Sequence, residues 1–243
     1  MQITLYTLGG AFGMRNVSPF CFKVEMLLTQ LGIPFEMVEE PDPRQAPKGK
    51  LPYVKIDGEV IADSDLITRK LDALTQGRVF GDLTPEQRGI GLGLTRLAEE
   101  HLYWILVASR WLDDAWWPNV VDGFFHIAPS FIRPFIAGRA RKGMRQTYDL
   151  QGLGRHTQSE QEQFARDDLA ALENAVGEHG FLFGDTPSYF DFAIAAILTG
   201  IYDNRPKTWL TPIAEEYKTL HQYVLRVQES VGLYAAEQAS QAS

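Results

Sequence analysis

Residues 50–64 read KLPYVKIDGEVIADS, and they combine a β-hairpin signal with a helix cap. Two apolar runs, Tyr53–Ile56 and Glu59–Ile61, flank the pair Asp57-Gly58. An Asp-Gly pair in this setting favours a type I′ turn, because that turn needs positive φ at both central positions. Asp63-Ser64 then caps a helix whose apolar residues recur at helical spacing. The stretch therefore predicts two antiparallel strands followed by a helix.

The residues before this stretch predict a βαβ unit. Gln2–Tyr6 alternates like a strand and runs into a glycine-rich loop. A helix begins after the N-cap Ser18, with Pro19 at its first position, and stops at Gly32. Phe35–Val38 supplies a second strand, parallel to the first if the crossover is right-handed. The order βαβ then ββα predicts an N-terminal α/β domain.

The remainder of the chain predicts helices only. After a linker at Gly77–Asp82, the segment Thr84–Gln87 combines an N-cap, a proline at the first helical position and a glutamine at N3. Similar capping boxes occur at Thr157–Glu160 and Ser188–Asp191. The segment Phe190–Leu198 is apolar on nearly every side, which is typical of a helix in the middle of a bundle.

The chain has 243 residues, of which 45% are hydrophobic, and it is long enough for two modest domains. We assign residues 1–77 to the α/β domain and residues 84–243 to an all-α helical bundle.

Composition limits the function. With 23 basic and 31 acidic residues the net charge is −8, which argues against a nucleic-acid partner. The start at Met1 lacks the pattern of a secretory signal, so we expect a cytoplasmic protein. The single cysteine, Cys21, excludes an internal disulfide or a thiolate metal cluster, and we expect no metal. The most apolar stretch, Phe124–Gly138, is too short to cross a bilayer, so no integral membrane segment is expected.

Leu51-Pro52 predicts a place where a ligand peptide can pair with the backbone. Pro52 opens a strand directly after a loop, and a cis peptide bond there would leave the Leu51 N–H and C=O unpaired. An extended peptide can satisfy such groups by β-type pairing. The simpler interpretation is that Leu51-Pro52 is only the start of a strand.

The next helix start predicts a site for an α-amino acid head. Ser64 offers a hydroxyl and free N–H groups to a carboxylate, and Asp63 can accept from an ammonium group. Lys48 and Lys50 lie on the approach and can pair with a second carboxylate. The alternative is that Asp63 and Ser64 only cap the helix. Their joint spacing around the hairpin favours a short zwitterionic peptide as ligand.

These two motifs resemble the cis-proline and acid–serine motifs of glutathione transferases, which carry them in a thioredoxin-like domain. The resemblance implies that the ligand is glutathione, acting as co-substrate. It also implies that Leu51 pairs with the cysteinyl backbone and that Asp63 and Ser64 hold the γ-glutamyl head. Transferases of this build usually pair as homodimers, which the sequence permits. A detoxifying conjugation of a small apolar electrophile is then the expected reaction.

The reactive end of the site is predicted at Ser18-Pro19-Phe20-Cys21, where the helix dipole favours a thiolate. This stretch is similar to the Cys-Pro-Phe start of omega-type transferases and to the Cys-Pro-x-Cys of glutaredoxins, with serine at the first cysteine position. No dithiol is possible. The Ser18 hydroxyl can instead hydrogen-bond the glutathione thiolate and lower its pKa, so that it attacks an electrophile. The alternative is that Ser18 only caps the helix.

Two other residues compete for the reactive role. Cys21 sits one turn inside the helix at the spacing of a buried packing residue. If it were exposed, it could form a mixed disulfide with glutathione and act as a one-cysteine thiol transferase. Tyr6 lies too far before the helix, and we interpret it as a strand or core residue.

A narrower resemblance covers most of the chain. Its residues are Ala11-Phe12-Gly13, the unit from Ser18 to Glu25, the stretch from Lys48 to Tyr53, and Gln151-Gly152-Leu153-Gly154-Arg155-His156. Together they resemble bacterial relatives of the failed-axon-connections and metaxin branch of the glutathione transferase superfamily. This resemblance implies the same fold and adds an alternative function, a non-catalytic protein that binds glutathione or a peptide, or acts as an adaptor.

Two further groups of side chains are open to a functional or a structural interpretation. Four tryptophans can line a pocket for an apolar electrophile or pack the helical core: Trp104, Trp111, Trp116 and Trp117. A basic run can attract an anion or a lipid surface, or form a solvated helix face: Arg133, Arg139, Arg141, Lys142 and Arg145.

Overall fold

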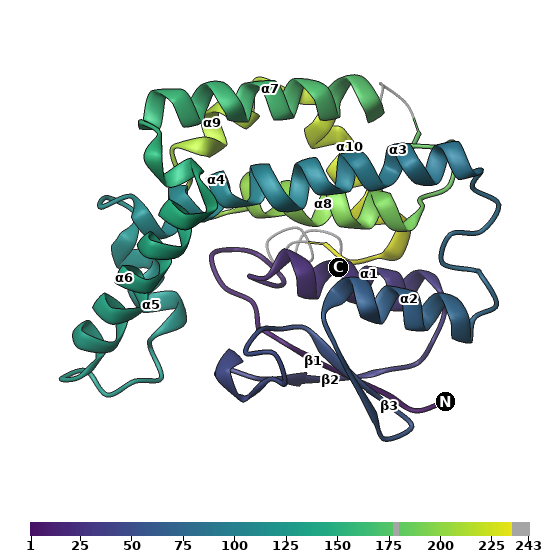
Figure 1. Ribbon diagram of the computed structural model, residues 1–243, viewed down its shortest axis with the longest axis horizontal. Coiled ribbons are helices and arrows are strands. Elements are labelled where there is room, and N and C mark those ends of the chain that lie inside the picture. The colour runs from purple at the N-terminus through teal and green to yellow at the C-terminus, as the bar shows by residue number, and fades with distance from the viewer. Residues whose placement is uncertain (177–179, 235–243) are drawn as a thin grey trace.

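The computed structural model describes residues 1–176 and 180–234. It has an N-terminal thioredoxin-like domain, at the bottom of Figure 1, and a C-terminal helical domain above it. Residues 235–243, which we assigned to the second domain, lie outside the described residues. The limits 1–77 and 84–243 stay a prediction.

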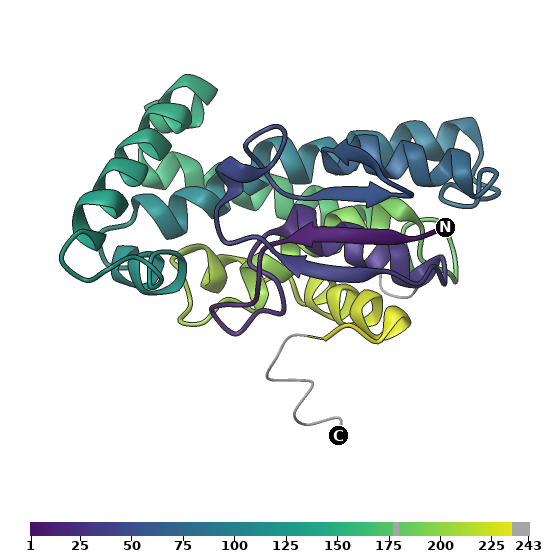
Figure 2. The ribbon, with the colours of Figure 1, turned by 90° about the horizontal axis from the view of Figure 1, so that it is seen from below.

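The N-terminal domain is built on one mixed sheet of four strands in the order β2-β1-β3-β4. The strands are β1 (Ile3–Thr7), β2 (Glu36–Glu39), β3 (Tyr53–Ile56) and β4 (Glu59–Ala62). β1 and β2 are parallel, whereas β3 is antiparallel to both β1 and β4. Asp57 and Gly58 have φ values of 48° and 93°, which confirms the predicted hairpin turn. Figure 2 shows the sheet from its open face, with the helices behind it.

Two helices, α1 (Pro19–Gln30) and α2 (Ser64–Leu74), lie between the sheet and the helical domain (Figure 1). A short 3₁₀ turn at Pro43–Gln45 interrupts the loop that leads to β3. Ser18 caps α1 as predicted, because its side chain accepts from the Cys21 N–H. The predicted βαβ-ββα order is confirmed.

The helical domain begins with a continuous helical segment from Pro85 to Leu112. It consists of α3 (Pro85–Arg96), a π-helical stretch (Leu97–Leu102), α4 (Tyr103–Val107) and a second π-helical stretch (Ala108–Leu112). The capping box at Thr84 is confirmed, since Thr84 and Gln87 exchange side-chain to backbone hydrogen bonds. The two π-helical stretches were not predicted. They widen the turn and change which side chains face the N-terminal domain.

The centre of the helical domain is α8 (Tyr189–Tyr202), in which every residue is buried, and among the described residues five other helices complete the domain. They are α5 (Trp117–Phe124), α6 (Arg133–Gln151), α7 (Gln158–Val176), α9 (Leu210–Ala214) and α10 (Lys218–Val231), with a 3₁₀ turn at Leu153–Arg155. The position of α8, packed against α1 and α10, confirms the predicted core helix. Asp191 accepts hydrogen bonds from the Ser188 N–H and hydroxyl and from the Tyr223 hydroxyl, so its role is structural.

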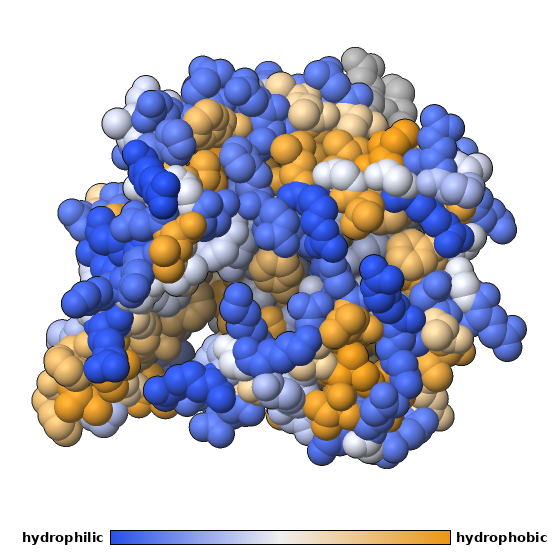
Figure 3. Space-filling model, viewed as in Figure 1, coloured by the Kyte–Doolittle hydropathy of each residue, from blue (hydrophilic) through white to orange (hydrophobic). Residues whose placement is uncertain are grey.

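Helices α5 and α6 extend away from the rest of the molecule at the lower left of Figure 1. Figure 3 shows apolar side chains gathered over this end. The large exposed apolar residues of this segment are Ile127, Phe131, Ile132, Phe135, Ile136 and, near the end of α6, Leu150. Among the described residues, no helix is long and apolar enough to cross a membrane.

Candidate functional site

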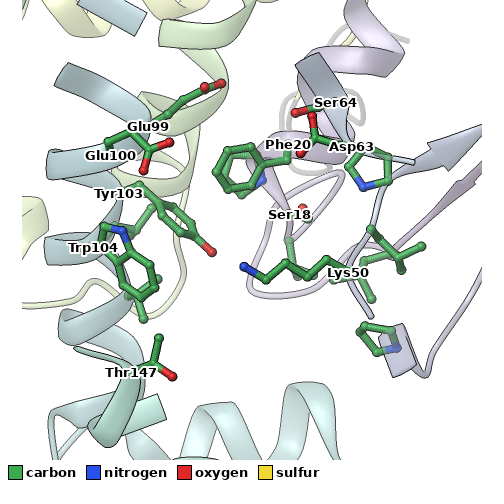
Figure 4. A pocket seen from close by; sticks show the side chains of 18 of the residues that line it. Ser18, Phe20, Lys50, Asp63, Ser64, Glu99, Glu100, Tyr103, Trp104 and Thr147 are labelled. Atoms are coloured by element: carbon green, nitrogen blue, oxygen red, sulfur yellow. The ribbon is translucent and has the colours of Figure 1, made fainter. Parts of the chain in front are cut away.

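A cavity of about 570 Å³ opens between the two domains (Figure 4). Its N-terminal wall comes from the start of α1, the loop before β3 and the start of α2, and its C-terminal wall comes from the two π-helical stretches, α4, α5 and α6. The predicted residues that line it are Ser18, Lys48, Lys50, Leu51, Pro52, Asp63 and Ser64. Of the predicted site residues, Cys21 is absent from this lining. The volume is in the range of small-molecule sites.

The start of α2 presents free polar groups to the cavity. Ser64 is the first residue of α2, and within the described residues its hydroxyl and N–H have no hydrogen-bond partner. Asp63 precedes it with a φ of 97°, a conformation that non-glycine residues adopt mainly at functional sites. One oxygen of Asp63, Oδ1, accepts from the N–H groups of Asp65 and Leu66, which leaves Oδ2 available. A carboxylate at Ser64 would also gain from the positive end of the helix dipole.

The loop before β3 presents backbone groups and cations. The Leu51-Pro52 peptide bond is cis, as predicted. Leu51 makes no backbone hydrogen bond with the described residues, so its N–H and C=O can pair with an extended ligand. Lys48 and Lys50 are exposed and make no ion pair with described residues. Figure 4 shows Lys50 directed across the cavity towards Tyr103.

Ser18 lies at the N-terminus of α1 with its hydroxyl at the cavity. Its backbone N–H donates to Asn16 Oδ1 over 3.0 Å, and its hydroxyl oxygen accepts from the Cys21 N–H over 3.3 Å. The hydroxyl also lies within hydrogen-bond reach of the Cys21 sulfur. Because a thiolate accepts a hydrogen bond more strongly than a neutral thiol, a bound thiolate would compete with Cys21 for the Ser18 proton.

Cys21 is fully buried behind Ser18. Burial raises the pKa of the thiol, although hydrogen bonds from Ser18 and Thr7 oppose the increase. The structure thus places Cys21 as a packing residue, the first of our two interpretations, and gives no support to a mixed disulfide at this position. Tyr6 lies in β1, where it stacks on Tyr53 with ring centroids 4.2 Å apart, and it does not line the cavity.

An ionic network next to Ser64 joins the two domains, with Lys23 and Glu99 buried and Asp65 and Arg96 partly exposed. Lys23 on α1 contacts Glu99 at 2.6 Å and Asp65 at 3.0 Å, and its Nζ donates to the Tyr189 hydroxyl. Arg96 on α3 contacts Asp65 at 2.5 Å and Glu99 at 3.3 Å. These contacts fix the start of α2 against the C-terminal wall, so the positions of Asp63 and Ser64 relative to that wall are set by ion pairs.

Glu100, the residue after Glu99, also lines the cavity; its carboxylate makes no hydrogen bond with a described residue but interacts electrostatically with Arg96. Figure 4 shows Glu100 on the wall that faces Asp63 and Ser64. This end of the cavity is therefore lined by more carboxylates (Asp63, Asp65, Glu99 and Glu100) than cations (Arg96), whereas the loop before β3 contributes the cations Lys48 and Lys50. This separation of charge matches a zwitterionic peptide.

The distal part of the cavity is aromatic. Trp104 and Trp111 line it together with Tyr103, Phe124 and Met144. Trp116 is buried, and Trp117 lies under the guanidinium of Arg141, so only two of the four tryptophans face the cavity. Such a lining suits an apolar group beside the thiol of a bound peptide.

The basic run on α6 divides into two kinds of residue. Arg133 donates to the carbonyls of His126 and Ala128, and Arg141 donates to those of Trp111 and Leu112. These two arginines fasten α6 to its neighbours. The others, Arg139, Lys142 and Arg145, are exposed on the helix surface, which is the solvated face of our second interpretation.

Sequence reasoning missed the polar residues of the C-terminal wall and the network behind it. These are Asp65, Arg96, Glu99, Glu100 and Arg110. One available signal was the pair Glu99-Glu100, which stands shortly before the wholly apolar and aromatic run from Leu102 to Val107. Among the described residues, no group of three or more histidine, cysteine, aspartate or glutamate side chains is arranged to hold a metal.

Comparison with known sequences gives a consistent assignment. The model of the glutathione S-transferase N-terminal domain matches residues 19–116, and that of the C-terminal domain matches residues 165–227. The chain is 33% identical over 218 residues to isoprene-epoxide–glutathione S-transferase of Rhodococcus sp. (strain AD45), covering 86% of this chain and 90% of that protein. It is 30% identical to Failed axon connections of Drosophila melanogaster and 26% identical to metaxin-1 of Mus musculus. Of those two proteins it spans only 50% and 61%.

Solved structures share the fold. The β-etherase LigF of Sphingobium sp. strain SYK-6 has a TM-score of 0.64 at 19% identity, and the match covers both chains completely. A glutathione S-transferase of Methylobacterium radiotolerans, in complex with glutathione sulfonate, has a TM-score of 0.61 at 17% identity over 94% of this chain and 91% of that one. Glutaredoxin 2 of Salmonella typhimurium, in complex with glutathione, has a TM-score of 0.58 at 14% identity over 97% of each chain.

Proposed function

The chain belongs to the glutathione S-transferase family, and we propose that it binds glutathione in the cavity between its domains and conjugates the thiol to a small apolar electrophile. The observation that carries the proposal is the convergence of Ser18, Leu51 and Ser64 on one cavity. These residues come from three separate segments of the chain, so it is the fold that brings them to one cavity.

Each part of glutathione has a complementary group in the cavity. The γ-glutamyl carboxylate binds the Ser64 hydroxyl and N–H at the start of α2, and its ammonium group binds Asp63. The cysteinyl backbone pairs with Leu51, whose own backbone groups are free. The glycine carboxylate binds Lys48 and Lys50.

This placement directs the glutathione sulfur towards the start of α1. The Ser18 hydroxyl donates a hydrogen bond to the thiolate, and the positive end of α1 stabilises the same charge. Both effects lower the pKa of the thiol, so that more of it is ionised at neutral pH. The thiol proton passes to solvent, and the thiolate attacks a carbon atom of an electrophile held against Tyr103, Trp104 and Trp111. As the C–S bond forms, an aryl chloride loses chloride, or an epoxide breaks one ring C–O bond and its oxygen takes a proton from water. An epoxide is a suitable first substrate to test, because the Rhodococcus relative is named for one.

A conjugation assay tests the catalytic half of the proposal. With glutathione and either 1-chloro-2,4-dinitrobenzene or a small epoxide, we expect turnover by the wild-type protein and a loss of about tenfold or more in kcat for Ser18→Ala, since a hydrogen bond to a charged group contributes about 1.5–3 kcal/mol. Ser130→Ala, at an exposed position outside the cavity, is the control.

The alternative is a protein that binds glutathione or a peptide without catalysis. Its support is the similarity to Failed axon connections and metaxin-1. Binding of glutathione without conjugation of either electrophile would favour this alternative. If turnover is equal in wild type and Ser18→Ala, the protein is a transferase, but Ser18 does not take part in its mechanism.

We also propose that the protein forms a homodimer. Large apolar side chains remain exposed on β4, α2 and α3, namely Val60, Leu66, Ile90 and Leu92. These side chains are available to an apolar interface, and the proposal rests on the usual pairing of transferases of this build. Sedimentation velocity distinguishes a dimer from a monomer of 27.4 kDa.

A further inference from the structure

Arg110 is a buried cation without a counter-charge, and it lines the distal part of the cavity. It lies in the second π-helical stretch, its side chain is only 5% exposed, and no described carboxylate pairs with it. Its Nη2 donates to the Gly200 carbonyl and approaches Met14 Sδ at 3.4 Å. Its Nε is buried and has no hydrogen-bond partner.

An arginine in this position is costly for the folded protein. A buried charge is normally paired, and a buried donor is normally satisfied, because both lose their interactions with water. Burial lowers the pKa of Arg110 to about 10, so the guanidinium keeps its charge at neutral pH. The bond to Gly200 would need only a neutral donor. The charge and the free Nε are therefore unexplained by packing.

The surroundings of Arg110 favour an anionic ligand. Tyr103 is close enough to interact electrostatically with the guanidinium, and burial raises the pKa of its hydroxyl, which stays a hydrogen-bond donor. Trp111, Phe124 and Met144 provide apolar walls. In such a setting a carboxylate would gain charge-assisted hydrogen bonds with little competition from water.

We propose that Arg110 binds a carboxylate of the second substrate, so that the cavity accepts apolar electrophiles that carry an acid group. The assignment of this subsite to an electrophile rests on the proposed transferase function. The subsite itself does not, because Arg110 lies on the C-terminal wall and its binding of an acid requires neither glutathione nor Ser18.

The test uses a matched pair of probes, cinnamate and its neutral amide cinnamamide, titrated into the full-length protein by calorimetry without glutathione. We expect the wild-type protein to bind cinnamate about tenfold more tightly than cinnamamide, which corresponds to about 1.4 kcal/mol. Arg110→Gln, which keeps a donor for the Gly200 carbonyl, should abolish this preference, and Arg110→Lys should retain part of it. Arg145→Gln, on the exposed face of α6, is the control.

Equal affinity of the wild-type protein for the two probes would overturn the proposal, as would a preference that survives in folded Arg110→Gln. If that variant does not fold, the double substitution Lys48→Gln/Lys50→Gln decides the assignment, because these two cations line the same cavity. A preference for cinnamate that persists in it supports Arg110, and one that disappears assigns the carboxylate to the lysines and overturns the proposal. A preference for cinnamate in a protein that conjugates no electrophile would support the subsite and contradict only the proposed transferase activity.

Discussion

Lys23 on α1 and Glu99 on the first π-helical stretch form an ion pair across the two domains, with Nζ and Oε1 2.6 Å apart and side chains 1% and 3% exposed. Burial alone would lower the pKa of Lys23, but the neighbouring Tyr189, Glu99 and Asp65 raise it above its ordinary value. The ammonium group therefore stays charged and holds the C-terminal wall of the cavity against α1.

Removing one partner of this pair should destabilise the whole protein. Lys23→Met leaves Glu99 buried without its ammonium group, and we expect the free energy of unfolding to fall by about 3–5 kcal/mol. Lys70→Met breaks the partly exposed pair with Glu59 and should cost less than about 1 kcal/mol. Urea unfolding measures both values, and equal effects of the two substitutions would show that the buried network does not hold the domains together.

Asp65 should make stability depend on pH in the acidic range. Burial opposes its ionisation, but Lys23 and Arg96 outweigh this effect and lower its pKa to about 2. Because the folded pKa lies below the unfolded value of about 3.9, ionised Asp65 stabilises the protein by up to about 2 kcal/mol above pH 4. That contribution is lost as the pH falls towards 2.

Urea unfolding of wild type and Asp65→Asn at several pH values checks this expectation. The difference in unfolding free energy between the two should be largest near neutral pH and should shrink below about pH 4. Asp82→Asn, at an exposed position, should show no such trend. A constant difference between wild type and Asp65→Asn would contradict the ion pairs with Lys23 and Arg96.

Cys21 should react slowly with thiol reagents in the folded protein. Its side chain is fully buried and burial raises its pKa, so little thiolate is present or accessible. We expect a colorimetric disulfide reagent to modify the native protein at least about a hundredfold more slowly than the unfolded protein, where access is complete. Fast stoichiometric reaction in native buffer would contradict this expectation and support the one-cysteine thiol transferase. Loss of disulfide-reducing activity in Cys21→Ala would then confirm that function.

Glu100 should contribute to glutathione affinity from the C-terminal wall. Its carboxylate accepts no hydrogen bond from the described residues and faces the start of α2, where the ammonium group of the γ-glutamyl head is proposed to bind. For Glu100→Gln we expect glutathione to bind about three- to tenfold more weakly, corresponding to about 0.6–1.4 kcal/mol. Glu36→Gln, on the exposed strand β2, provides the comparison. If Glu100→Gln binds glutathione as tightly as wild type, Glu100 on the C-terminal wall does not contribute to binding of the γ-glutamyl head.

The sequence predicted the elements whose signals are local. The Asp57-Gly58 turn, the Ser18 cap and the Thr84 capping box each depend on residues within a few positions of one another, and the structure confirms all three. The core helix α8 was equally recognisable, because a helix that is apolar on every side has to be buried.

The C-terminal wall could not be predicted in the same way. Helical periodicity assumes 3.6 residues per turn, whereas the π-helical stretches around Glu99 and Arg110 alter the spacing locally. It also cannot be predicted from the sequence which face of the segment from Pro85 to Leu112 packs against the N-terminal domain. That choice follows from contacts such as Lys23 with Glu99, which are 76 residues apart in the chain.

Calorimetric titration of glutathione into wild type and Ser64→Ala tests the central claim, that the start of α2 binds the γ-glutamyl head. Loss of a hydrogen bond to a charged carboxylate costs about 1.5–3 kcal/mol, so we predict binding to wild type and an affinity at least about tenfold weaker in Ser64→Ala. Ser130→Ala should bind like wild type. No binding by the wild-type protein, or equal affinity in Ser64→Ala, would contradict the claim.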